Sequence, residues 1–71
     1  MMIRYTRHAR VRMRERRVSE EQVEAVVLSP DDWRHGDDDE IIATKRLGKR
    51  RVKVVYLSLP KEIKVITVMV D

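Results

Sequence analysis

The sequence predicts an α+β fold in which two N-terminal helices pack on a three- to four-stranded antiparallel β-meander. Helix-capping patterns occur only in the first part of the 71-residue chain, before Pro30. From Ile41 onward, apolar residues recur at every second position, which is typical of strands. Two turn sequences divide this Val-rich half into three segments. The chain is therefore expected to form one domain, residues 1–71, near the lower size limit for folding without a disulfide or metal.

Two short helices are expected in tandem. The first begins after the N-cap residue Thr6 and runs to about Arg17. Ser19 and Gln22 have the spacing of a capping box at the start of the second helix, which ends at about Leu28. Short helices that follow each other so closely form an αα-hairpin.

Three strands are expected in the C-terminal half, and they span Ile41–Leu47, Arg50–Leu59 and Ile63–Val70. Gly48-Lys49 is predicted to be a two-residue hairpin turn. Pro60-Lys61 suits the centre of a type I turn. Near the N-terminus, Ile3–Tyr5 is either a further short strand or an extended lead-in to the first helix.

Counting outward from the turns places Leu47 opposite Arg50 and Leu59 opposite Glu62. The face with one charge is expected to pack against the helices, and it holds Ile41, Ala43, Lys45, Val52, Val54, Tyr56, Ile63, Val65, Thr67 and Met69. The other face holds a basic corner of Arg46, Arg51, Lys53 and Lys64 and an apolar strip of Val55, Ile66 and Val68. The repulsion across the basic corner indicates a site for an anion. The apolar strip predicts a homodimer through this exposed sheet face.

The acidic segment 31–39 is expected to be a solvated loop. Its three consecutive Asp residues suggest a metal site, but adjacent carboxylates repel one another and their spacing fits no calcium loop. His35 could join His8 as a ligand, although two isolated histidines do not define a metal centre. We therefore expect no metal and no cofactor. Trp33 is either a lid on the core or an anchor for a partner.

Composition narrows the class of protein further. The chain has no Cys, which excludes disulfides and thiolate metal sites, and it has no apolar run long enough for a membrane span or a signal peptide. A cytoplasmic location is expected. The high charged fraction of 39%, with no Asn and a single Gln, suits a thermophile or a GC-rich genome.

Charge is strongly segmented along the chain. Residues 1–18 carry seven positive charges and one negative, residues 19–44 one positive and nine negative, and residues 45–71 eight positive and two negative. The two basic ends can meet on one side of the fold, which would form the electrostatic footprint of a nucleic-acid-binding protein. The alternative is a well-solvated surface that neutralises itself.

The arginine-rich segment Tyr5–Val18 carries the candidate catalytic residues. On a helix, His8, Arg12, Glu15 and Arg16 fall on one face about 100° wide. An imidazole can transfer protons near neutral pH, guanidinium groups bind phosphate, and a carboxylate can orient them or act as the base. Each residue taken alone has a structural alternative: His8 as a cap, Arg12–Glu15 as an ordinary ion pair, and Arg16 as a cover for the sheet edge.

The pattern His8-Ala9-x-x-Arg12-Met13-x-Glu15-Arg16-x-Val18, followed by Ser19-Glu-Glu-x-Val23, resembles a family of small bacterial and archaeal domains of unknown function. Val65-Ile66-Thr67-Val68 is similar to the closing strand of that family. The resemblance covers nearly the whole chain. Length and element order are also similar to the RelE/ParE/BrnT toxins of toxin–antitoxin operons. This similarity implies a RelE/BrnT-like fold, a metal-independent endoribonuclease, an RNA substrate and an antitoxin partner.

The resemblance also implies which residues form the site. It places the motif on His8, Arg12, Glu15 and Arg16, with Thr67 on the last strand. The wider toxin group works from arginines and lysines on the sheet, and the candidates for RNA binding here are Arg46, Arg51, Lys53 and Lys64. Either Thr67 or Tyr56 could donate a hydrogen bond to the phosphate. The rival class is a non-enzymatic module that binds nucleic acid or protein.

Overall fold

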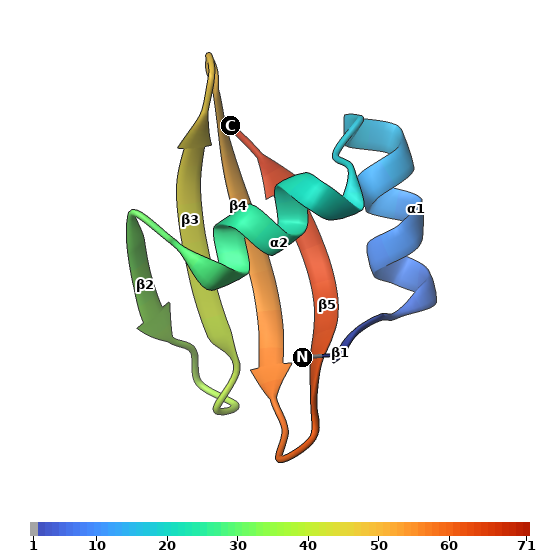
Figure 1. Ribbon diagram of the computed structural model, residues 1–71, viewed down its shortest axis with the longest axis vertical. Helices are drawn as coiled ribbons and strands as arrows, with labels where there is room; N and C mark the ends of the chain where they lie inside the picture. Colours follow the sequence, from blue (N-terminus) through green and yellow to red (C-terminus); the bar gives the residue numbers. More distant parts are fainter. Residues whose placement is uncertain (1) are drawn as a thin grey trace.

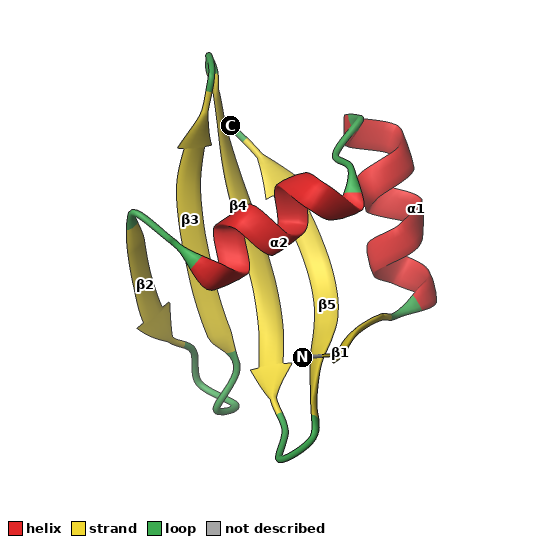
Figure 2. Ribbon diagram, viewed as in Figure 1, coloured by secondary structure: helices red, strands yellow, loops and turns green. Residues whose placement is uncertain are grey.

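The computed structural model describes residues 2–71 as two helices and a five-stranded mixed sheet (Figures 1 and 2). In chain order the elements are β1 (Met2–Tyr5), α1 (Arg7–Arg16), α2 (Glu20–Leu28), β2 (Asp32–His35), β3 (Ile41–Leu47), β4 (Arg50–Ser58) and β5 (Glu62–Val70). In space the strands lie in the order β1-β5-β4-β3-β2. In Figure 1, α2 crosses one face of the sheet and α1 stands beside β5. Within this described range, neither helix is long and apolar enough to cross a membrane.

The α+β prediction is confirmed, but the three- to four-stranded antiparallel meander, and with it the RelE/BrnT-like fold prediction, is wrong. The meander β3-β4-β5 is present, and it is extended by β1 at one edge and β2 at the other. β1 pairs with β5 in parallel, so Ile3–Tyr5 belongs to a strand. A parallel pair requires a long connection, and here every other element of the fold lies between the two strands in the chain.

β2 lies inside the segment that was expected to be a loop. It pairs antiparallel with β3, and the hairpin is closed by a hydrogen bond from the Gly36 amide to the Glu40 carbonyl oxygen at 2.8 Å. Asp39 adopts the left-handed conformation in the turn, with φ of 65°, and Asp tolerates this conformation better than most residues. All four residues of β2 are exposed. The strand therefore lacks the apolar alternation by which strands are usually recognised.

A β-bulge in β5 changes which side chains face the core. Near the β4–β5 turn the predicted register holds, with Tyr56 opposite Val65, but farther along Val55 lies opposite Thr67. Ile66 is the additional residue. Because one inserted residue moves every later side chain to the other face, Val68 is fully buried while Thr67 and Met69 leave the core face. The expected positions of these three residues were wrong.

The hydrophobic core lies between the helices and one face of the sheet. α1 contributes Ala9 and Met13, and α2 contributes Val23, Val26 and Val27. The sheet adds Ala43, Val52, Val54, Tyr56, Ile63, Val65 and Val68. Each fully buried Val stabilises the fold by roughly 1.5–3 kcal/mol through removal of apolar surface from water. Since both helices bury their apolar residues in this one core, the opposite face of the sheet has no helical cover.

The two helices are fixed in place by caps and by one arginine of the sheet. The Thr6 hydroxyl accepts from the Ala9 amide, and the Ser19–Gln22 capping box is formed as predicted. Arg50 donates to the carbonyl oxygens of Arg16 at 2.6 Å and Arg17 at 2.9 Å, where α1 ends. These bonds join the C-terminus of α1 to the start of β4 and hold the helix against the sheet.

Candidate functional site

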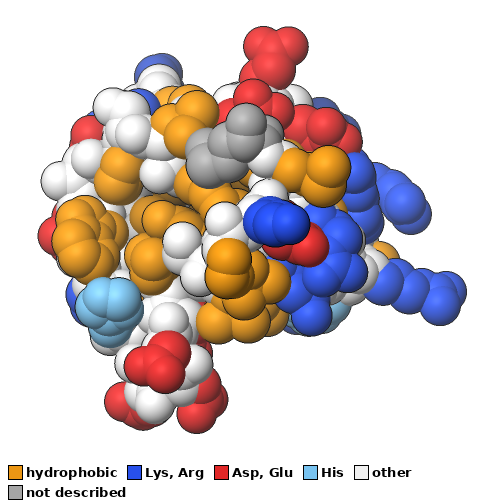
Figure 3. Space-filling model, turned by 60° about the horizontal axis from the view of Figure 1, so that its bottom comes forward, with side chains coloured by type: hydrophobic (Ala, Val, Ile, Leu, Met, Phe, Trp, Pro, Cys, Tyr) orange, Lys and Arg blue, Asp and Glu red, His pale blue; other side chains and the backbone are white. Residues whose placement is uncertain are grey.

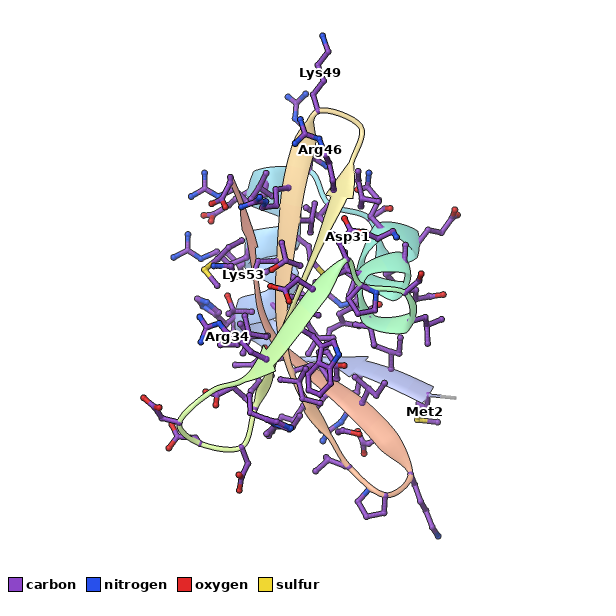
Figure 4. All side chains as sticks on the ribbon, turned by 90° about the vertical axis from the view of Figure 1, so that its left-hand side faces the viewer. Met2, Asp31, Arg34, Arg46, Lys49 and Lys53 are labelled. Carbon is purple, nitrogen blue, oxygen red and sulfur yellow. The ribbon has the colours of Figure 1, made fainter. Side chains whose placement is uncertain are left out.

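The uncovered face of the sheet, which we call the open face, presents the side chains that alternate with those of the core. By register these are Met2 and Arg4 on β1, Asp32 and Arg34 on β2, Ile42, Thr44 and Arg46 on β3, Arg51, Lys53, Val55 and Leu57 on β4, and Glu62, Lys64, Thr67 and Met69 on β5. Figure 4 shows Arg34 and Lys53 on the side of the sheet away from α2. The open face is rich in cations and has no aromatic residue among these positions.

The first of two grooves on this face, the sheet groove, crosses β2, β3 and β4. It has a volume of about 380 Å³ and is lined by Asp31, Asp32, Arg34, Ile42, Thr44, Arg46, Arg51, Lys53 and Asp71. Arg46 lies directly opposite Arg51, as predicted. Asp31 already accepts a bond from the Arg46 amide at 2.8 Å and lies 3.7 Å from the Lys45 ammonium. The lining therefore holds four cationic side chains and three carboxylates, and within it the opposed Arg46–Arg51 pair is a like-charge contact that an anion would relieve.

The second groove, the helix groove, lies between α1 and the last part of β5. Its volume is about 470 Å³, and its lining consists of His8, Arg12, Arg16, Thr67, Val68, Met69, Val70 and Asp71. His8 Nε2 lies 3.0 Å from Thr67 Oγ1, within hydrogen-bonding distance. The helix periodicity thus places His8, Arg12 and Arg16 at one groove as predicted, and the bulge in β5 brings Thr67 to the same groove.

Thr6 links the start of α1 to the bulge. Its hydroxyl donates to the Ile66 carbonyl oxygen at 2.9 Å while accepting from the Ala9 amide at 3.0 Å. The same residue's amide donates to the Val65 carbonyl oxygen at 3.0 Å. Because Thr6 lies two residues before His8 and Ile66 lies one residue before Thr67, these bonds fix the spacing of the His8–Thr67 pair.

Glu15 is the one member of the predicted helix cluster that does not line the groove. Its carboxylate lies 3.4 Å from the Arg12 guanidinium, and both side chains are about half exposed. An exposed pair of this kind contributes a few tenths of a kcal/mol. Glu15 therefore orients Arg12 rather than His8. Asp71 is the acidic residue in the lining of the helix groove, and it also lines the sheet groove, which makes the two grooves neighbours on the open face.

Other predicted site residues lie elsewhere. Lys64 is on the open face opposite Leu57 but lines neither groove. Tyr56 is buried in the core, where desolvation raises the pKa of its phenol, so it cannot donate to a phosphate in the helix groove. Val68, expected in the exposed apolar strip, is a core residue, which reduces that strip to Val55 and Ile66.

The acidic loop and its neighbours show no arrangement for a metal ion. Within residues 2–71, no group of three or more His, Cys, Asp and Glu side chains is placed to hold one. His35 instead contacts Trp33 edge to face, with ring centroids 5.5 Å apart. Trp33 is 55% exposed, which excludes the alternative of a lid on the core. Figure 3 shows acidic side chains projecting at the lower edge, well separated from the Lys and Arg side chains gathered on the side of α1.

Sequence reasoning missed Arg34, Thr44 and Asp71, which complete the two grooves. Arg34 was overlooked because β2 was taken for a loop. The available signal was the short run Trp33-Arg34-His35 between Asp-rich segments, since aromatic residues favour strands and Gly36 and Asp39 favour a turn.

Together the fold and the grooves define a small α+β domain with a basic, uncovered sheet face. A family model described as "Domain of unknown function (DUF4258)" matches residues 5–70, and the chain belongs to this family. Comparison with curated proteins gave no match, and comparison with solved structures gave none either. The prediction of a small domain of unknown function is thereby confirmed.

Proposed function

We propose that this domain binds RNA through phosphate groups on its open face and cleaves it without a metal ion in the helix groove. The observation that supports this most is the adjacency of the two grooves. The cations of the sheet groove can hold one part of an RNA backbone while the helix groove, with its imidazole and two guanidinium groups, receives a neighbouring phosphate.

The open face favours recognition of the backbone over recognition of bases. Arg46 on β3 lies directly opposite Arg51 on the adjacent strand β4, so each raises the affinity of the sheet groove for an anion. Stacking of unpaired bases needs aromatic platforms, and the open-face positions of the described strands carry none. The expected substrate is therefore RNA bound with little base preference.

His8 would transfer protons in the reaction. The 2′-hydroxyl oxygen attacks the adjacent phosphorus, the bond from phosphorus to the 5′-oxygen breaks, and a 2′,3′-cyclic phosphate and a 5′-hydroxyl end result. Because Nε2 is bonded to Thr67 Oγ1, His8 would take the proton of the attacking hydroxyl at Nδ1. A water molecule protonates the leaving 5′-oxygen, and the resulting hydroxide recovers the proton from His8. Arg12 and Arg16 stabilise the added negative charge on the phosphate. Thr67, 3.0 Å from His8, orients the ring.

The same proposal includes a role as the toxin of a toxin–antitoxin pair, acting in the cytoplasm with an antitoxin covering the open face. Its support is limited to the length of the chain and the order of two helices followed by a β-meander, which are similar to those of the RelE/ParE/BrnT group. Induced expression in a bacterium should then arrest growth, and expression of His8→Ala should not.

The direct test is cleavage of labelled RNA by the purified protein in the presence of EDTA. We expect the wild type to produce fragments with 2′,3′-cyclic phosphate ends and His8→Ala to lose at least about 100-fold of that activity, the usual contribution of a general acid or base. His35→Ala is the matched control, because that imidazole contacts Trp33 and lies in neither groove. Full cleavage by a folded His8→Ala protein would refute the catalytic role.

A binding module without catalysis is the second candidate. It is favoured by the position of Glu15, which pairs with Arg12 and leaves His8 without a carboxylate within hydrogen-bonding distance in residues 2–71. A single imidazole without a second proton-transfer group is a modest catalyst. Retardation of RNA in a gel with no cleavage, lost equally in Arg51→Ala and in Arg12→Ala, would support this candidate instead.

A further inference from the structure

β2 leaves one edge of the sheet open. It is the last strand in the spatial order and pairs only with β3, and Figure 4 views the molecule from this edge. All four of its residues are exposed. An open strand edge can pair with another strand unless its charges or its shape prevent this. The charged side chains of β2 therefore determine which strand can pair with it.

The backbone groups that face outward can be assigned from the hairpin. The bond from the Gly36 amide to the Glu40 carbonyl oxygen is in register with the pairs that Arg34 and Asp32 make with β3. In an antiparallel ladder, residues alternate between bonding to the neighbour and pointing away from it. Arg34 and Asp32 therefore bond to β3, and Trp33 directs its N–H and C=O toward the open edge.

We propose that β2 pairs antiparallel with β2 of a second copy of this chain, about a twofold axis at Trp33. The two Trp33 residues then exchange both backbone hydrogen bonds. In this register Asp32 of each copy lies opposite Arg34 of the other, on the open face, so that two interchain ion pairs form. The partner is thus a second copy because the strand is complementary in charge to itself.

The charges also exclude the neighbouring twofold register. Centring the axis on Arg34 would place two guanidinium groups directly opposite each other. It would also leave Asp32 with no residue of the second β2 strand opposite it. Within residues 2–71 neither Asp32 nor Arg34 takes part in an ion pair, so both charges are free for the second copy. Trp33, 55% exposed, adds apolar surface at the axis on the opposite side of the sheet.

The pairing is expected to be weak, because a four-residue strand buries less area than a stable dimer needs. In the resulting dimer the two sheets join into one, and their open faces are continuous across the twofold axis. The inference does not depend on the proposed RNA function, since it rests on the backbone and charges of β2 alone.

The test is analytical ultracentrifugation of the isolated protein over a series of concentrations. We expect the wild type to shift from monomer to dimer as concentration rises, with the emission of Trp33, the sole tryptophan, moving to shorter wavelength in parallel. Asp32→Arg and Arg34→Asp should each remain monomeric, because each creates two like-charge pairs. Lys49→Asp, at the tip of the β3–β4 turn (Figure 4), is the matched control and should dimerise as the wild type does.

Mixing the two monomeric variants tests the register itself. One Asp32→Arg chain and one Arg34→Asp chain restore two opposite-charge pairs, so their mixture should form a heterodimer, which also proves that both variants are folded. A wild type that is monomeric at every concentration would overturn the proposal, as would an Asp32→Arg variant that dimerises normally. Capture of a strand of another protein by β2 in place of self-pairing would overturn it as well.

Discussion

Tyr5 has a buried hydroxyl oxygen that lacks a hydrogen-bond partner within residues 2–71. The Arg10 guanidinium lies 4.3 Å from the centroid of its ring, an attraction that a phenyl ring retains. Desolvation by burial raises the pKa of the phenol, the charges of Glu20 and Glu24 raise it further, and the charge of Arg10 opposes them. Tyr5 thus stabilises the fold through its ring, whereas its buried hydroxyl, which has no hydrogen-bond partner, lowers the free energy of unfolding.

Tyr5→Phe is expected to raise the free energy of unfolding by about 1 kcal/mol at neutral pH, because it removes an unsatisfied polar atom. The raised pKa of Tyr5 also means that the folded state loses stability as pH rises above the ordinary value of 10.0 toward the folded pKa. The variant should therefore show a smaller alkaline loss in urea unfolding measured across pH.

Tyr56→Phe is the control for this prediction. Its phenol pKa is likewise raised by burial, so the variant should reduce the alkaline loss, but it removes no unsatisfied buried oxygen and should give no gain at neutral pH. Equal gains in both variants would contradict our account of Tyr5.

Arg50 lies in the basic segment Lys49-Arg50-Arg51, but its role is to hold the end of α1 rather than to bind an anion. Its guanidinium donates to the carbonyl oxygens of Arg16 and Arg17, which α1 leaves unpaired at its end, and it lies 3.4 Å from the Gln22 amide oxygen. Arg17 itself adopts the left-handed conformation at the helix end, with φ of 55°. The junction between the helices thus depends on one side chain from β4.

Arg50→Ala is expected to lower the free energy of unfolding by about 2 kcal/mol, since charged donors contribute more than neutral ones. Thermal or urea unfolding measures this directly. Arg51→Ala, one residue along on the open face, should change stability little. If the two substitutions were equally costly, the loss would reflect strand propensity rather than the bonds to α1.

At the scale of elements, the helix ends and the turns could be predicted from the sequence, whereas the pairing of the strands could be predicted only in part. The caps of both helices, the β3 boundaries and the Leu47–Arg50 register followed from residue type and spacing. The bulge in β5 did not, because Val65-Ile66-Thr67-Val68 has no Gly or other residue that marks one. The helix side of the candidate site was therefore predictable, whereas Thr67 was assigned to the wrong face.

The edges of the sheet were less predictable still. β2 has no buried residue, so hydrophobic periodicity cannot detect it. The parallel pairing of β1 depends on β5, a partner from the opposite end of the chain, and no local pattern encodes that choice. Both strands are fixed by tertiary contacts.

For the whole molecule, the distribution of charge is the feature that matters most. α1 lies beside β5, and the cations of β3 and β4 lie on the open face. The acidic loop between β2 and β3 stays apart from the arginines of α1 (Figure 3). An RNA that lies across both grooves would displace counterions from its phosphates, and its affinity would depend steeply on salt.

We therefore predict that the slope of log affinity against log salt concentration falls in magnitude by about 0.7 in Arg51→Ala, the value for one contact to a single-stranded phosphate. Arg14→Ala, on the exposed side of α1, should leave the slope unchanged because it lines neither groove. Fluorescence anisotropy with labelled RNA measures both slopes. Equal effects of the two substitutions would indicate attraction by net charge alone.

The parallel pairing of the first strand with the last has a consequence for biosynthesis. β1 emerges from the ribosome early but can complete its pairing only after β5 has followed, so the fold cannot close while translation of that strand is under way. His8 and Thr67 are 59 residues apart in the chain. Nascent chains would consequently lack an assembled helix groove, and any activity of the groove would begin only once β5 has left the exit tunnel.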